Sequence, residues 1–265
     1  MKQNLILLTL GLVMGLVCGA HQASAEPAWS VLKSEHFVVH YMEGGSAFAG
    51  DVLQKAEDYY DEILRELGFP RRANFWLWEN RCRIYLYLTK ESFRKATSQP
   101  EWSAGIAVPS ERALVSYDRA NDFLNSILRH EMAHLIFHDF LGIRNNHVPL
   151  WLDEGIAMTM EEKKRSEFDL IVQKMVREKS WIPVEAIEKM RSLKGTSTPE
   201  AAFFYAQSQS LVRFIKETRD SHTFLQFCRD LRDGNRLQDA LRKNYPRDFE
   251  TLEHLEKKWV MSHGF

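Results

Sequence analysis

The order of the predicted secondary structure restricts the fold of this chain more than any other feature. Before residue 121, four segments rich in β-branched and aromatic residues predict strands: 36–41, 83–89, 102–108 and 112–117. One helix is predicted among them, over 51–67. From Asn121 onward the apolar residues recur at helical spacing, and the predicted helices are 121–141, 149–161, 164–179, 199–219, 221–232, 235–243 and 247–262. Strands followed by helices predict an α+β fold.

The first 25 residues have the pattern of a secretory signal peptide. Lys2 is followed by the mostly apolar run 5–17 and then by Ala23-Ser24-Ala25, which predicts cleavage after Ala25. An uncleaved membrane anchor is the competing interpretation, but the apolar run is shorter than the ~20 residues that span a bilayer. We therefore expect an exported protein, periplasmic or secreted, with no stable membrane insertion after cleavage.

The remaining residues, 26–265, are enough for one domain or for two lobes that share a cleft. The 35 Lys and Arg residues nearly balance the 36 Asp and Glu residues. Such a chain has no overall field to attract nucleic acid, so we expect no nucleic-acid partner. Cleavage of the signal peptide would leave two cysteines, Cys82 and Cys228. A disulfide and two isolated buried thiols both fit the sequence.

The residues that indicate chemistry are His130-Glu131-Met132-Ala133-His134, within the predicted helix 121–141. His130 and His134 lie one turn apart on the same helix face, so both imidazoles can reach one ion. Glu131 is offset by about 100° and is well placed to accept a proton from a metal-bound water. Roughly 0.03 such pentads are expected by chance in a chain of this composition. The alternative is a buried helix with two core histidines.

A catalytic zinc usually has three protein ligands and a water, so a third ligand is needed. The downstream candidates are His138, His147, Asp153 and Glu154. His138 lies on the same helix as the pair, and three ligands on one straight helix do not easily converge. His147 falls in a predicted loop, where a solvent-facing or helix-entry position is more plausible. Glu154 follows His134 by enough residues for the chain to reverse and for a second helix, entered at Pro149, to return a carboxylate to the metal.

These motifs resemble the gluzincin metallopeptidases. The gap of about twenty residues between the pentad and Glu154 matches the thermolysin-like members. The segment Trp151-Leu152-Asp153-Glu154-Gly155 is closer to aminopeptidase-like gluzincins and to small exported peptidase-MA-like domains. The resemblance extends more loosely over 36–259 and includes Tyr205-Ala206-Gln207-Ser208. A metzincin is excluded, because Phe137 and Phe140 occupy the positions of its Gly and His.

The resemblance implies a zincin-like fold. Its strand-rich lobe, 26–141, would be a small mixed sheet packed on the zinc-binding helix at the end of the lobe. A mainly helical lobe, 142–265, would carry the third ligand. His130, His134 and Glu154 would then bind one Zn²⁺ per chain, with Glu131 as the general base.

Two departures from the family pattern affect the predicted specificity and the predicted support of the ligands. No Gly-Ala-Met-Glu-Asn-type segment precedes the zinc helix, which favours an endopeptidase over an aminopeptidase. Segment 102–107 occupies the comparable place, either as an edge strand that pairs with peptide backbone or as an ordinary strand. Met158 stands where thermolysin-like enzymes keep an Asp that orients a ligand histidine. Asp153 or a backbone carbonyl would have to orient it instead.

Tyr205 is the candidate donor to the oxyanion of the attacked carbonyl. Its neighbours Phe203 and Phe204 leave a core role open. His222 is a weaker candidate, for which helix capping or exposure is more usual. The charge run from Glu161 to Arg165 predicts a solvated helix face.

The function that these residues predict is an exported zinc metallopeptidase acting on a peptide or protein substrate through a zinc-activated water. One alternative is a catalytically silent zinc-binding protein of the cell envelope, with the helical region from residue 160 as a partner-binding surface. Another is an exported helical interaction protein in which His130 and His134 are core residues.

Overall fold

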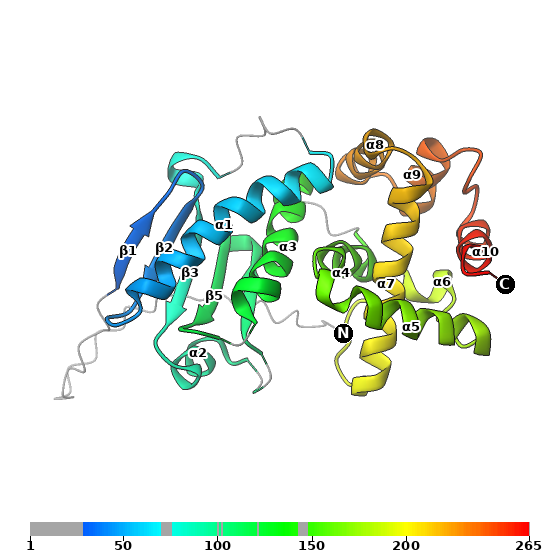
Figure 1. Ribbon diagram of the computed structural model, residues 1–265. Helices are drawn as coiled ribbons and strands as arrows, with labels where there is room; N and C mark the ends of the chain where they lie inside the picture. Colours follow the sequence, from blue (N-terminus) through cyan, green and yellow to red (C-terminus); the bar gives the residue numbers. More distant parts are fainter. Residues whose placement is uncertain are drawn as a thin grey trace, which may run out of the picture.

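A computed structural model describes residues 29–69, 76–99, 101, 103–120, 122–142 and 148–264. The expected signal peptide, Trp102 and His147 lie outside the described residues. A strand-rich N-terminal part and a helical C-terminal part lie next to each other (Figure 1). Both contribute to one core of buried residues that extends from Phe37 to Trp259.

Within the described part of the chain the sheet has five strands. The strands are β1 (Ser30–Lys33), β2 (Phe37–Tyr41), β3 (Cys82–Tyr87), β4 (Gly105–Val108) and β5 (Ala113–Tyr117). Their order is β1-β2-β3-β5-β4, with β2, β3 and β5 parallel and the two outer strands antiparallel to their neighbours. In β3, Cys82, Ile84 and Leu86 are buried and the residues between them are not, as one covered face requires. β4 pairs with β5, and no other strand of the described residues covers its outer edge.

Two helices of the N-terminal part pack on the sheet and on each other, namely α1 (Ser46–Glu66) and α3 (Leu128–Leu141) (Figure 1). The buried face of α1 includes Val52, Ala56 and Ile63, which recur at helical spacing. A shorter helix, α2 (Lys90–Thr97), contacts β3 and β5. Directly before α3 the chain forms a π-helical turn, η3 (Phe123–Ile127).

The C-terminal part is helical and is built around α7. Its helices are α4 (Leu150–Thr159), α5 (Glu162–Glu178), α6 (Val184–Ile187), α7 (Thr198–Thr218), α8 (Ser221–Arg232), α9 (Leu237–Asn244) and α10 (Leu252–Ser262). Both α4 and α5 pack along α7. Gly155 permits a very close approach, since a Cβ at this position would lie 2.5 Å from the Ser208 carbonyl oxygen on α7.

The observed elements confirm the predicted mixed α+β composition, with several local differences. β1, α2 and α6 are additions to the predicted elements, and the predicted helix 121–141 begins with the π-turn rather than with α-helix. The predicted helix 247–262 begins only at Leu252, where the Thr251 side chain caps it by accepting a hydrogen bond from the His254 N–H. No helix among the described residues has both the length and the apolarity needed to cross a membrane.

The cysteines are isolated from each other in the structure. Cys82 on β3 and Cys228 on α8 are both buried and carry free thiols. Burial raises the pKa of each thiol well above its ordinary value. Of the two arrangements that the sequence allows, the structure therefore has two separate buried thiols.

Candidate metal centre

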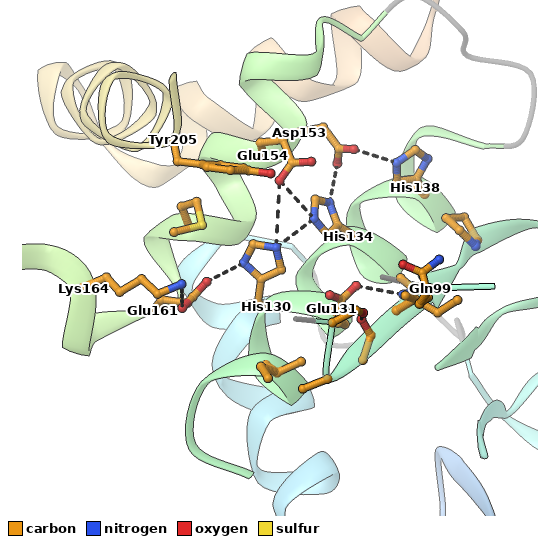
Figure 2. Close-up of a pocket in the computed structure, with 18 of the residues that line it drawn as sticks. Gln99, His130, Glu131, His134, His138, Asp153, Glu154, Glu161, Lys164 and Tyr205 are labelled. Carbon is orange, nitrogen blue, oxygen red and sulfur yellow. Dashed lines mark hydrogen bonds and ion pairs between the residues drawn. The ribbon is translucent and has the colours of Figure 1, made fainter. Parts of the chain in front are cut away.

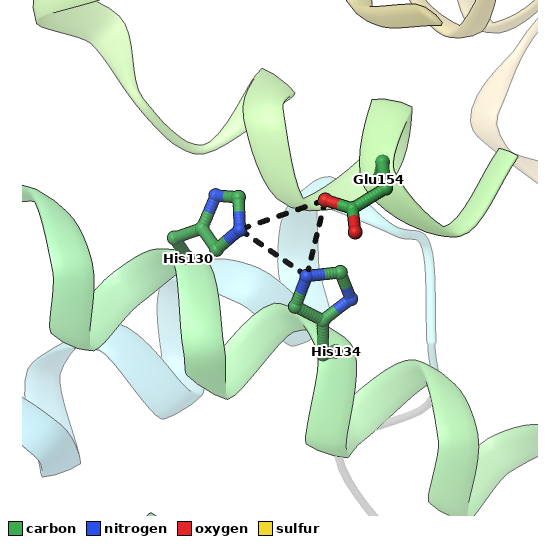
Figure 3. Close-up of side chains that lie close together, drawn as sticks. All are labelled: His130, His134 and Glu154. Atoms are coloured by element: carbon green, nitrogen blue, oxygen red, sulfur yellow. Dashed lines mark hydrogen bonds and ion pairs between the residues drawn. The ribbon is translucent and has the colours of Figure 1, made fainter. Parts of the chain in front are cut away.

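The two histidines of the pentad meet on one face of α3. His130 Nε2 lies 3.2 Å from His134 Nε2, as their one-turn separation predicts (Figure 3). The π-turn η3 leads directly into this helix, and the helix packs beside the edge strand β4. A Cβ on Gly105 would come within 2.9 Å of the Ile127 side chain, so glycine allows this close approach. π-Helical turns inserted in α-helices are frequent at functional sites.

Glu154 on α4 brings a carboxylate to the same point. Its Oε2 lies 3.7 Å from His134 Nε2 and 3.9 Å from His130 Nε2 (Figure 3). The equidistant point in the plane of the three atoms lies about 2.1 Å from each, which matches the bond lengths of zinc to histidine nitrogen and carboxylate oxygen. Together, His130, His134 and Glu154 can hold a metal ion. Of the other proposed third ligands, His138 and Asp153 lie behind His134 rather than at this point.

Asp153 fixes the ring of His134. Its Oδ1 lies 3.0 Å from His134 Nδ1, and its Oδ2 lies 3.1 Å from His138 Nε2 (Figure 2). A carboxylate on Nδ1 favours the tautomer that is protonated there, which leaves the Nε2 lone pair directed at the metal position. Asp153 is one of the two groups that we expected from the sequence to orient a ligand histidine. The structure adds His138, which holds the second carboxylate oxygen.

Glu161 has the same place behind His130, and the prediction of a solvated face for this residue is wrong. Its side chain is only 5% exposed, and its Oε1 lies 2.8 Å from His130 Nδ1 in an ion-pair contact (Figure 2). Ser126 Oγ donates a 2.6 Å hydrogen bond to Oε2, and Lys164 Nζ lies 2.9 Å from the same oxygen. Glu161 is the first residue of the charge run and directly follows Met160, the buried residue that caps the C-terminus of α4. This position could have indicated that Glu161 is buried, because a residue next to the apolar end of a helix can still face the core.

The imidazoles are surrounded by an excess of negative charge. Burial disfavours the charged form of His134, but Asp153 and Glu154 outweigh this effect and raise the pKa of His134 to about 10. Burial also raises the pKa of the Glu154 carboxyl. Burial alone would raise the pKa of Glu161, but contacts with His130, Ser126 and Lys164 outweigh it and lower this pKa to about 2. A divalent cation at the centre would balance these carboxylates.

Glu131 lies between α3 and the edge of the sheet. Its Oε2 accepts a 2.8 Å hydrogen bond from the Ala107 backbone N–H of β4. This N–H therefore points away from β5, to the outer edge of β4 that faces the cleft. Glu131 and residues 103–107 line the same cavity of 650 Å³ as the two histidines and Glu154. The expected edge strand is thus present beside the metal position, and Gln99 adds a polar lining residue outside the predicted site.

Tyr205 reaches the site from α7. Its ring lines the cavity, and its hydroxyl points toward Glu154 (Figure 2). Burial, followed by the charges of Glu154 and Glu131, raises the pKa of Tyr205 to about 12, so the phenol keeps its proton at neutral pH. His222, the weaker candidate, is exposed on α8 and contacts Gln226 instead.

The comparison with known families agrees with this arrangement. Residues 78–262 match the family model of the Peptidase MA superfamily. The match covers more than half of the chain and includes β3, β4, β5, α3 and the helical part. The chain therefore belongs to the Peptidase MA superfamily. Membership in this superfamily suggests peptidase activity and dependence on a metal. No curated protein matches the chain closely enough for comparison.

Proposed function

We propose that this protein is a zinc-dependent metallopeptidase of the gluzincin type that cleaves peptide bonds within a chain. The observation that supports the proposal is that His130 Nε2, His134 Nε2 and Glu154 Oε2 lie close enough together for one zinc ion to bind all three. These three residues would hold the ion, and it would be present once per chain. When bound, zinc polarises a carbonyl and lowers the pKa of a water molecule to about 7.

The residues of this chain supply the proton transfer. The Glu131 carboxylate accepts the proton of the attacking water and delivers it to the leaving amine. Its hydrogen bond from Ala107 holds the carboxylate at the cleft wall before substrate binds. Tyr205 donates a hydrogen bond to the oxyanion that develops on the attacked carbonyl, since its phenol remains protonated.

The substrate backbone would pair with β4. The outer edge of this strand lines the cleft beside Glu131, and an extended peptide can add to such an edge through main-chain hydrogen bonds when Glu131 releases the Ala107 N–H. Pairing along an edge places a peptide bond in the interior of a chain at the metal position. This mode of binding favours endopeptidase over aminopeptidase action.

Zinc quantification on the wild type and on Glu131→Gln, coupled to a screen of proteome-derived peptides, tests the proposal. We expect one zinc per chain in both proteins, because Glu131 is not a ligand. Cleavage should fall by about 10²- to 10⁴-fold in the variant. Cleavage by Glu131→Gln at a near wild-type rate would remove the general-base role. Stoichiometric zinc without any cleavage by the wild type would instead favour a catalytically silent zinc-binding protein.

We also propose that the protein is exported. The support for export is the N-terminal pattern that ends at Ala25. Mass spectrometry of the protein isolated from its native source should find a mature N-terminus at Glu26. A chain that retains residues 1–25 would contradict cleavage.

A further inference from the structure

A second cavity opens on the far side of Glu154 and Tyr205. It has a volume of 450 Å³ and shares these two residues with the cavity of the metal centre. Its other wall is Leu150 and the turn 191–194 between α6 and α7. A substrate that extends past Tyr205 would therefore enter this cavity.

The second cavity adds two cations to the shared Glu154, whereas carboxylates predominate among the charged residues of the first. The metal centre is lined by Glu131, Asp153, Glu154 and Glu161, and its one lysine among the described residues, Lys164, is paired with Glu161. Arg191 and Lys194 line the second cavity, are exposed, and have no carboxylate partner within the described part of the chain. They are the unpaired cations of the two cavities, as far as the structure describes their walls.

Arg191 is held in place while most of its donors stay available. Its Nη1 donates to the backbone carbonyl oxygens of Glu188 and Met190, which fixes the guanidinium against its own turn. Nε and Nη2 have no partner among the described residues. A guanidinium with two adjacent nitrogens free can bind a carboxylate through two parallel hydrogen bonds.

We propose that this second cavity binds a carboxylate of the peptide substrate through Arg191 and Lys194. The inference rests on the proposed peptidase function and adds a substrate class, namely peptides with a negative group a short distance from the cleaved bond. The carboxylate can be an Asp or Glu side chain or the C-terminal carboxylate. A bound divalent cation would balance the carboxylates of the metal centre, so the direction in which the peptide lies would depend on the two cations of the second cavity.

Binding of labelled synthetic peptides, followed by fluorescence anisotropy, tests the inference without hydrolysis. The protein is the zinc-loaded Glu131→Gln variant, and the reference peptide is neutral with both ends blocked. One series carries a single Glu at successive positions, and a second carries only a free C-terminal carboxylate. We expect tighter binding in at least one series, and the series that responds identifies the source of the carboxylate.

Arg191→Gln combined with Lys194→Gln should lower the affinity for the responding peptides by about tenfold and leave the neutral peptide unchanged. Lys189→Gln is the matched control, since Lys189 is an exposed lysine that precedes the same turn and does not line the cavity. All three substituted positions are exposed, and circular dichroism checks the fold of each variant. Arg191→Lys with Lys194 intact should retain the charge preference and lose part of the affinity.

The inference is wrong if the starting protein binds all peptides equally or binds none of them. It is also wrong if the preference survives the double substitution. Its failure is distinct from failure of the proposed function. Peptide cleavage by the wild type without a carboxylate preference would overturn only the second site. A carboxylate preference lost on double substitution, in a protein that cleaves no peptide, would overturn only the peptidase proposal.

Discussion

Each of the two proposed ligand histidines has a carboxylate at its Nδ1, and the two carboxylates come from different places in the chain. Asp153 immediately precedes the third ligand and holds His134, whereas Glu161 lies at the end of the segment that follows α4 and holds His130. Partners of this kind typically change metal affinity by 10- to 100-fold when they are lost. Ser126 and Lys164 in turn hold Glu161, so the π-turn η3 also contributes to the orientation of His130.

Glu161→Gln should weaken zinc binding by about 10- to 100-fold, because His130 loses the charge that orients its ring. Competition with a chromophoric zinc chelator measures this change. Glu167→Gln is the control, since Glu167 is exposed on α5, the helix that begins directly after Glu161. Equal zinc affinity of the two variants would show that Glu161 does not orient the ligand.

Tyr205→Phe should lower kcat by about 10²- to 10³-fold with little change in KM, as expected when an oxyanion donor is removed. The raised pKa of about 12 means that the donating form is lost only in strongly alkaline solution. In the metal-free protein, the ultraviolet absorbance change that is present in the wild type and absent from Tyr205→Phe should therefore appear only above about pH 11. A difference signal that titrates near pH 10 would contradict this pKa.

At the scale of the elements, the contact between α4 and α7 is what places Tyr205 near Glu154. Gly155→Ala would place a Cβ 2.5 Å from the Ser208 carbonyl oxygen and 2.6 Å from Val212, so one helix must move. We expect a loss of about 1–3 kcal/mol in the free energy of unfolding, measured by denaturant titration of the metal-free protein.

Gly50→Ala is the matched control for that substitution. Gly50 lies within α1, and a Cβ there would meet nothing within 4 Å. This change should be neutral or stabilising by up to about 1 kcal/mol, because alanine favours a helix more than glycine does. An equal loss of stability in the two variants would show that the α4–α7 contact is not the cause.

The predicted elements are those whose sequences carry their own signal. Segment 83–89 combines β-branched and aromatic residues, and β3 is found there. The short elements have weaker patterns. β1 has four residues and is mostly exposed, and α2 is defined largely by the reciprocal cap of Thr89 and Ser92. The π-turn η3 depends on the positive φ of Asp122 and on packing against Gly105, which no local period reveals.

The part of the site that depends on the geometry of a single helix could be predicted from the sequence. The spacing of His130 and His134 fixes their common face, and the motif around Glu154 supplied the third candidate. Glu161, Arg191 and Lys194 were not predictable in the same way. Their roles depend on how α5 and the turn 191–194 lie against α3 and α4, which is a tertiary relation.

At the scale of the whole molecule, the metal would join the two parts of the chain. His130 and His134 belong to α3 of the strand-rich part, and Glu154 belongs to α4 of the helical part. Zinc in hundredfold excess over its Kd should stabilise the folded protein by about 2.7 kcal/mol, which raises the Tm by several degrees. A thermal melt with and without a chelator measures this shift.

Two variants distinguish the loss of a zinc ligand from other effects of a substitution on the Tm. Glu131→Gln should keep the zinc-dependent rise in Tm, because it leaves the three donor atoms in place. Glu154→Gln should lose most of the rise, since the anionic ligand is removed. The same rise in all three proteins would indicate that zinc binds elsewhere.

The most direct test of the central claim is anomalous diffraction at the zinc absorption edge from crystals of the zinc-loaded protein. We expect one strong peak per chain, about 2.1 Å from His130 Nε2, His134 Nε2 and Glu154 Oε2, with solvent at the remaining position. A peak at another set of side chains, or no peak at these three, would contradict it.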